Sequence, residues 1–462
     1  MKKNLQLLTK LKKALLSRIT DQRDRRILFA AFTAFAAKFG GVALQLFSIP
    51  LVVRTLGVQN FSIFAIGSSI IAFVMLSNFG ISGYVVSAVS AARNQPKEFR
   101  NTGEIMAAAL HVTVALGLLL LLATYIYSLT FGLDNIFGGM YLHAPEVVTN
   151  VLYLILIFGV IQSTSGIFVD AQNAYQELHY SNLYGGSANF VSALAIVGYS
   201  FLANEARVLG YLLALYLPMM VCQVINSVHF LLRHPEARPQ LKLVKRSLIV
   251  TALCGGGAFF IAQTVLPITI REFPKFLLAA RGELDQVTTY ALLMTLLTML
   301  FGIFSSFTQP LFGGFADAWN TGETTWVMKR IFLVVAAYAL SGVVLMLVGY
   351  FYGFKLTSIW VGVDAGINNR TMLLFGLFFG LVGIFNILTI ALYAMNQKFH
   401  CIMINIITTI CILTAVMLMG KSVEIWHILT TISLALAFIG IPMGLVIVLH
   451  KYSNSSRSIE LK

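Results

Sequence analysis

The stretch Glu104–Phe131, EIMAAALHVTVALGLLLLLATYIYSLTF, decides the fold class of this chain. Glu104 at its first position is its only Asp, Glu, Lys or Arg residue. An α-helix needs about 20 predominantly apolar residues to cross the hydrocarbon core of a bilayer. The stretch therefore predicts a transmembrane helix.

The rest of the chain has the same character. Of its 462 residues, 58% are hydrophobic and only 11% are charged, and the mean hydropathy is +0.84. A soluble domain carries about 25% charged residues, so this supply cannot build a water-exposed surface. The composition excludes a soluble protein and predicts a membrane protein.

The same length criterion, applied along the whole chain, predicts twelve spans. We therefore expect an all-α polytopic membrane protein with no soluble domain, because no loop between the spans exceeds about 20 residues. The predicted spans are 27–53, 61–90, 104–131, 147–169, 181–202, 207–232, 248–270, 287–311, 329–352, 371–394, 400–419 and 427–450.

Lysine and arginine predict the orientation. With the N-terminus inside, the cytoplasmic segments carry 23 of the 32 basic residues and the external loops carry eight. Because basic residues gather in cytoplasmic loops, we expect both termini in the cytoplasm. Residues 1–26 hold nine of these basic residues among leucines at helical spacing. This pattern is typical of an amphipathic helix on the anionic leaflet, with a solvated basic tail as the alternative.

The two halves of the chain look related. Six spans per half is an even number, so the two halves would share one orientation. We predict six-helix bundles at 27–232 and 248–450, a cytoplasmic linker at 233–247 and a cytoplasmic tail at 451–462. Three pairs of residues recur at offsets of 223 to 225 positions: Asn173 and Asn396, Gly159 and Gly383, and Gly57 and Gly282.

Several functional classes find no support in the sequence. It contains no GxxxxGK[ST], no GxGxxG after a strand and no HExxH, and its four cysteines form no CxxC or Cys/His cluster. We therefore expect no metal and no bound cofactor. The net charge of +14 lies in short loops between apolar spans, which sets topology rather than binding nucleic acid.

Lys38 is the most informative polar residue of the first half, because it lies within the first predicted span. A lysine at the centre of a transmembrane helix costs about 2.5–3.5 kcal/mol on insertion scales. Gln45 falls on the same helical face, and Gly41 and Ser48 flank it. We expect this stripe to line a wet cavity. The alternative is a lysine whose side chain reaches the cytoplasmic interface.

Other polar residues of the first half allow two readings. Arg54 ends the first span between Pro50 and Gly57, and it could bind substrate or anchor the helix at the interface. Asn78 in the second span and the run 162–165 in the fourth could face a central cavity. Hydrogen bonds between helices would explain them equally well.

The second half opens with a basic stretch that contains Arg271, Lys275 and Arg281. These three residues lie between the seventh and eighth predicted spans, on the predicted external side. The stretch could be an external phosphate contact, or only a solvated loop.

Taken in order, these segments resemble the polysaccharide-transporter branch of the multidrug/oligosaccharidyl-lipid/polysaccharide (MOP) flippase superfamily. The resemblance covers about residues 27–450. Asn78 stands where the family often has Asp, and Lys275 stands where it often has Arg. The supporting motifs are PLVVRTLG at 50–57, FSIF at 61–64, NFGI at 78–81, FPKFLL at 273–278, VTTYA at 287–291 and the segments around Asn173 and Asn396.

The resemblance implies a MATE-like fold, in which two six-helix bundles enclose a cationic central cavity that opens alternately to each side. Its implied cargo is an undecaprenyl-diphosphate-linked oligosaccharide, such as an O-antigen repeat unit, carried across the bacterial inner membrane. Polysaccharide polymerase or assembly proteins are implied partners. Coupling to a proton or sodium gradient is open.

Two other functions remain to be weighed. An ion-coupled exporter of drugs or small molecules would share the fold, but it should carry acidic cavity residues for cationic drugs. A membrane-embedded polymerase or glycosyltransferase should show a sizeable external loop with paired charged residues, and the sequence has none. We therefore expect a flippase and not an enzyme.

Overall fold

The computed structural model describes residues 22–75, 81–93, 101–203, 207–240, 246–253, 265–419 and 424–460. Within these ranges the chain forms helices and no strand. Most of the predicted segment 1–26 lies outside them, as does Asn78. The helices are α2 (Gln22–Met75), α3 (Ile81–Arg93), α4 (Thr102–Thr130), α5 (Asp134–His143), α6 (Pro145–Ala174), α7 (Leu178–Leu202), α8 (Val208–Arg233), η3 (Pro235–Ala237), α10 (Val265–Arg271), α11 (Phe273–Ala280), α12 (Leu284–Asn320), α13 (Thr324–Val361), α14 (Asn369–Ala394), α15 (Lys398–Met417), α16 (Ile425–Ala435), the π-helix η5 (Leu436–Gly440) and α17 (Ile441–Glu460).

The all-α, multi-pass fold class is confirmed. Ten helices in the described part of the chain are long and apolar enough to cross a membrane. One of them, Ala37–Val74, covers residues 37–53 of the first predicted span and 61–74 of the second, on either side of Gly57. The seventh predicted span falls partly in 254–264, outside the described residues. The total of twelve spans therefore stays a prediction.

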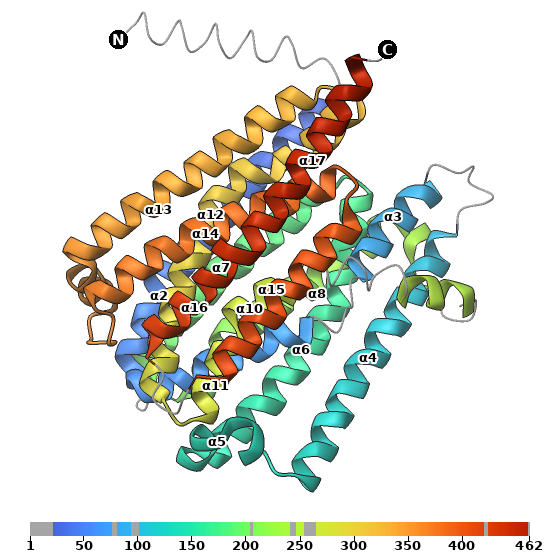
Figure 1. Cartoon of the computed structure of the whole chain (residues 1–462). Helices are drawn as coiled ribbons and strands as arrows, with labels where there is room; N and C mark the ends of the chain where they lie inside the picture. The colour runs from blue at the N-terminus through green and yellow to red at the C-terminus, as the bar shows by residue number, and fades with distance from the viewer. Residues whose placement is uncertain are drawn as a thin grey trace, which may run out of the picture.

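Large apolar side chains cover the outside of the bundle. Leu118, Leu119 and Leu122 of α4 are 57%, 61% and 54% exposed, and Leu340 and Phe351 of α13 are 67% and 64% exposed. Figure 1 shows α4 and α13 on opposite flanks of the molecule. Water would disfavour such surfaces, whereas lipid tails accept them. The buried core lies between the helices, with one cluster shared by both halves and a smaller one under α3 and α4.

The start of α2 and the end of α17 lie at the same end of the bundle (Figure 1). We call this end the terminal side and the opposite end, where α5 lies, the distal side. The sequence predicts that they face the cytoplasm and the exterior respectively. At the terminal side, Glu177 accepts bonds from Arg233 and His234 at 3.2 and 3.0 Å, which ties the α6–α7 turn to the start of the predicted linker.

Glu236 continues this network on the terminal side. Burial alone would raise the pKa of Glu236. Hydrogen bonds from its own backbone and from Tyr175, and its contact with His234, outweigh burial and hold the pKa below its usual range. The start of the linker is therefore fixed to the first half by charged contacts.

Turn geometry supports the internal repeat and corrects one pairing. Gly57 and Gly282 both have positive φ, at 75° and 81°, as two equivalent turns require. Asn396 has a left-handed backbone conformation, with φ 58°. In the first half the residue with the same conformation is Gln176, also with φ 58°, and not Asn173. Sequence identity selected the wrong residue, because the turn is defined by its backbone and its hydrogen bonds rather than by an asparagine.

Glycines let α13 and α14 pack with their backbones in contact. A Cβ at Gly342 would lie 3.0 Å from Cα of Gly380, and one at Gly349 would lie 2.7 Å from the Met372 carbonyl oxygen. Small residues permit this close approach between helices in a membrane. The two helices therefore form one tightly joined pair.

Labelling of introduced cysteines tests the orientation. We expect Asp134→Cys, at the exposed start of α5, to react with a membrane-impermeant thiol reagent in intact cells. Gln240→Cys, at the start of the linker, should react only after the cells are permeabilised. Reaction of Gln240→Cys from outside would contradict the orientation. The native cysteines Cys222, Cys254, Cys401 and Cys411 are first replaced.

Candidate functional site

Lys38 joins the two halves of the protein. It lies on α2, is partly buried, and its Nζ donates to Oγ of Ser305 on α12 at 2.9 Å. Oγ of Ser305 in turn donates to the carbonyl oxygen of Gly302 at 3.0 Å. The lysine therefore lies between the halves, where the resemblance places the cargo pathway, and it does not point only into lipid.

The polar and small residues predicted to share one helical face with Lys38 lie in different surroundings. Gln45 is partly exposed, whereas Ser48 is only 1% exposed and its hydroxyl has no hydrogen-bond partner. Gly41 faces α7, where Nδ2 of Asn189 would lie 3.3 Å from a Cβ at this glycine. Helical spacing predicted one face, but Ser48 is buried and Gly41 packs against α7.

Arg54 binds the end of a helix from the other half. Its Nε donates to the carbonyl oxygen of Val361 at 2.5 Å, and its Nη2 donates to those of Trp360 and Ile359 at 3.1 and 3.4 Å. These carbonyls belong to the last turn of α13, where a helix leaves them unpaired and carries partial negative charge. Arg54 therefore caps α13 at the distal side.

Two more hydrogen bonds strengthen this distal contact. Nε1 of Trp360 donates to the carbonyl oxygen of Leu46 at 2.9 Å, and Oγ1 of Thr288 donates to that of Val58 at 2.5 Å. Both cross from the second half to α2. The two halves are thus joined at the distal side by hydrogen bonds from three side chains.

The basic stretch of the second half is not a solvated loop. Its residues form the short helices α10 and α11. Lys275 is 7% exposed and pairs with the carboxylate of Glu272, which is 6% exposed. Arg281 donates to the carbonyl oxygen of Met419 at 3.0 Å. The alternative of a solvated loop is therefore wrong, because each cation of this stretch finds a partner inside the protein.

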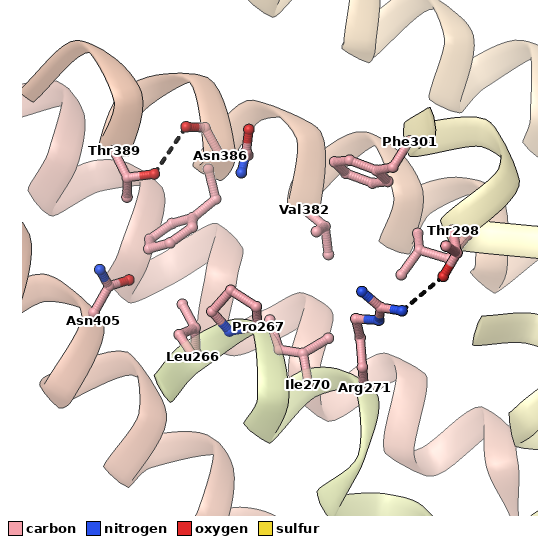
Figure 2. A pocket seen from close by; sticks show the side chains of 12 residues that line it. Leu266, Pro267, Ile270, Arg271, Thr298, Phe301, Val382, Asn386, Thr389 and Asn405 are labelled. Carbon is pink, nitrogen blue, oxygen red and sulfur yellow. Dashed lines mark hydrogen bonds between the residues drawn. The ribbon is translucent and has the colours of Figure 1, made fainter. Parts of the chain in front are cut away.

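Arg271 lies in a cavity inside the second half, shown in Figure 2. Nη2 of Arg271 donates to Oγ1 of Thr298 at 2.9 Å, while its buried Nε has no hydrogen-bond partner. Asn386 and Asn405 lie across the cavity from this arginine (Figure 2). The cavity, about 190 Å³, is lined by Leu266, Pro267, Ile270, Arg271, Leu297, Thr298, Phe301, Val382, Phe385, Asn386, Thr389 and Asn405.

The chemistry of this cavity suits an anion or a hydroxyl group. A guanidinium with an unused donor binds phosphate or carboxylate oxygens, and the amides offer both donors and acceptors. Among the described residues, no group of three or more His, Cys, Asp or Glu side chains could hold a metal ion.

The structure separates the predicted site residues into three places. Lys38 lies between the halves, Arg54 at the distal contact, and Arg271 in the cavity of the second half, near the Lys275–Glu272 pair. Sequence reasoning missed Glu272, Asn386 and Asn405. The signal for the asparagines was present, since each is an amide within a strongly apolar predicted span.

The comparisons with known proteins identify the family of the chain. Residues 30–318, more than half of the chain, match a family described as polysaccharide biosynthesis proteins. The chain belongs to this family. Membership of the polysaccharide biosynthesis family confirms the resemblance seen in the sequence. One relative, a candidate O-antigen transporter of Salmonella typhi, is 18% identical over 383 residues, which are 81% of this chain and 85% of the relative.

Solved structures confirm the fold of this polysaccharide biosynthesis family member. Lipid II flippase MurJ in an inward closed conformation gives a TM-score of 0.67 at 13% identity, covering 93% of this chain and 90% of that one. An inward-facing multidrug resistance MATE transporter of the MOP superfamily gives 0.66 at 10% identity, covering 92% and 99%. The fold is that of the MOP superfamily, and the matched proteins are transporters or flippases rather than enzymes.

Loss of the Arg54 contact should open the distal side. Thr288 is 0% exposed, so Thr288→Cys in a background without native cysteines should react slowly with an external thiol reagent. Adding Arg54→Ala should speed this reaction about fivefold to tenfold, since an exposed charge-assisted hydrogen bond contributes on the order of 1 kcal/mol.

The matched control is Lys355→Ala, which removes a charge from the same end of α13 without removing a side-chain hydrogen bond within the described residues. It should leave the reaction rate unchanged. Equal rates with and without Arg54 would show that this arginine does not hold the distal side closed.

Proposed function

We propose that this protein is a flippase that moves an undecaprenyl-diphosphate-linked oligosaccharide, such as an O-antigen repeat unit, across the bacterial inner membrane. The observation that carries the proposal is Lys38, a cation held between the two halves at membrane depth. Membership of the polysaccharide biosynthesis family supports the same substrate class.

The physical problem of such cargo explains the cation. A diphosphate and its sugars cannot cross hydrocarbon without polar partners, because an unpaired charge in a low dielectric costs many kcal/mol. Lys38 can exchange its bond with Ser305 for a stronger, charge-assisted bond to a phosphate oxygen. The lipid tail needs no such help and stays in the bilayer.

The distal contact supplies one gate of an alternating-access cycle. With Arg54 bound to the last turn of α13, cargo enters from the terminal side. Release on the other side requires these bonds and the Thr288–Val58 bond to break. Each is individually modest, so the two states differ by an energy that cargo binding can supply.

A drug exporter of the same fold is the second candidate, because MATE transporters share the fold. Such an exporter needs an accessible carboxylate for a cationic drug. Glu272 is buried and neutralised by Lys275. The charge that lies between the halves is positive, which favours an anionic cargo.

Substitution of Lys38 tests the proposal by complementation of surface glycan in a deletion strain. Lys38→Ala should fold and insert normally, because removing a charge from a span relieves an insertion cost. It should lower surface glycan at least about tenfold, since a charge-assisted hydrogen bond contributes roughly 1.5–3 kcal/mol. Lys38→Arg should keep part of the activity, and Lys38→Glu should be the most defective.

Protein levels are compared by blotting, with Lys355→Ala as the control for loss of a lysine outside the pathway. A wild-type amount of surface glycan from well-expressed Lys38→Ala would show that transport does not need the charge of Lys38 and would contradict a cationic pathway. Normal glycan in the deletion strain together with increased sensitivity to cationic drugs would favour the exporter instead.

A further inference from the structure

A second cavity, of about 270 Å³, lies inside the first half. Helices α6, α7 and α8 each contribute to its wall, in the portions of these helices nearer the terminal side. Its lining contains no Asp, Glu, Lys or Arg. The lining residues are Gln162, Val169, Ser181, Tyr184, Gly185, Ala188, Asn189, Met219, Gln223 and Asn226.

Amide side chains dominate the polar part of this cavity. Asn226 is fixed by a reciprocal pair of hydrogen bonds with Gln172, at 2.8 and 3.0 Å, and both residues are 1% exposed. Gln162, Asn189 and Gln223 make no side-chain hydrogen bond with the described residues. Three unused amides at membrane depth are costly unless a ligand or water satisfies them.

This cavity lies beside the helix that carries Lys38. Gly41, three residues after Lys38, leaves room for Asn189, whose Nδ2 would lie 3.3 Å from a Cβ at that glycine. Gly186 on α7 likewise approaches Ala37, with 3.3 Å between its Cβ position and Cα of Ala37. The amide Asn189 thus lies within about one helical turn of the lysine along α2.

The chemistry of the lining selects a neutral polar ligand. Amides both donate and accept hydrogen bonds, so they match hydroxyl and acetamido groups. A lipid chain would leave the three amides unsatisfied, and a charged group would find no partner of opposite charge. The volume lies near the lower end of the usual range of about 300–1,000 Å³ for ligand pockets, which suits one sugar rather than an oligosaccharide.

We propose that this amide-lined cavity binds the sugar attached directly to the diphosphate of the cargo, while Lys38 binds the diphosphate. The inference rests on the proposed function and deepens it, because it gives the flippase a contact that depends on the glycan. The cavity thereby distinguishes lipid diphosphate that carries sugar from lipid diphosphate that carries none.

Two glycines of α7 provide a matched pair of variants. A Cβ at Gly185, which lines the cavity, would meet no heavy atom within 4 Å, and the same holds for Gly198, which does not line it. Gly185→Leu therefore places an apolar side chain at the cavity lining, and its Cβ meets no neighbouring atom. Gly198→Leu makes the same chemical change outside it, and both changes improve helix propensity.

The probes are undecaprenyl diphosphate and undecaprenyl diphosphate that carries a single N-acetylhexosamine. Binding of each to the purified full chain in lipid nanodiscs gives two dissociation constants and their ratio. We expect the unsubstituted protein and Gly198→Leu to bind the sugar-bearing lipid at least about tenfold more tightly, the effect of one or two hydrogen bonds. Gly185→Leu should reduce the ratio to near one while its affinity for undecaprenyl diphosphate is unchanged.

Asn189→Leu, which keeps the number of side-chain heavy atoms but removes the amide, should also reduce the ratio, and it serves if Gly185→Leu does not fold. Lys38→Ala should weaken binding of both probes alike. A ratio near one in the unsubstituted protein, or an unchanged ratio in Gly185→Leu and Asn189→Leu, would overturn the sugar site while leaving the flippase proposal standing. Failure of both probes to bind the unsubstituted protein would instead count against the proposed function itself.

Discussion

The hydrocarbon of a bilayer offers no hydrogen-bond partner, and this constraint governs the whole structure. The described spans are therefore helical, which pairs backbone groups within each helix, and several polar side chains pair between helices. Lys38 meets Ser305, and Gln172 meets Asn226. Within α10 and α11 the same rule joins Lys275 to Glu272. In two cavities, polar groups that stay unpaired leave room for a polar ligand.

Unpaired polar groups occur in a cavity of each half, and their chemistry differs. The second half has Arg271, with an unused Nε, beside two amides. The first half has amides alone. In the proposed cycle this difference suits a cargo with an anionic part and a neutral part. The two cavities therefore differ in what they can bind.

Much of the fold could be predicted from the sequence because apolar length is a local property. The stretch that begins at Glu104 corresponds to α4, and Gly57 marks the kink within α2. The partner of Arg54 could not be predicted, since Val361 is 307 positions away. The solvated-loop alternative for residues 271–281 considered only the three cations. It left out Glu272, which lies three residues before Lys275 and pairs with it.

The glycine contacts between α13 and α14 have a mechanical consequence. Because Gly342 and Gly349 bring the two backbones into contact, sliding of α13 along α14 is sterically opposed, and the two helices form one rigid unit. Arg54 binds the distal end of this unit at the Val361 carbonyl oxygen, and the turn at Gly322 lies at the other end of α13. Any movement of α13 that follows the loss of these hydrogen bonds would therefore carry α14 with it.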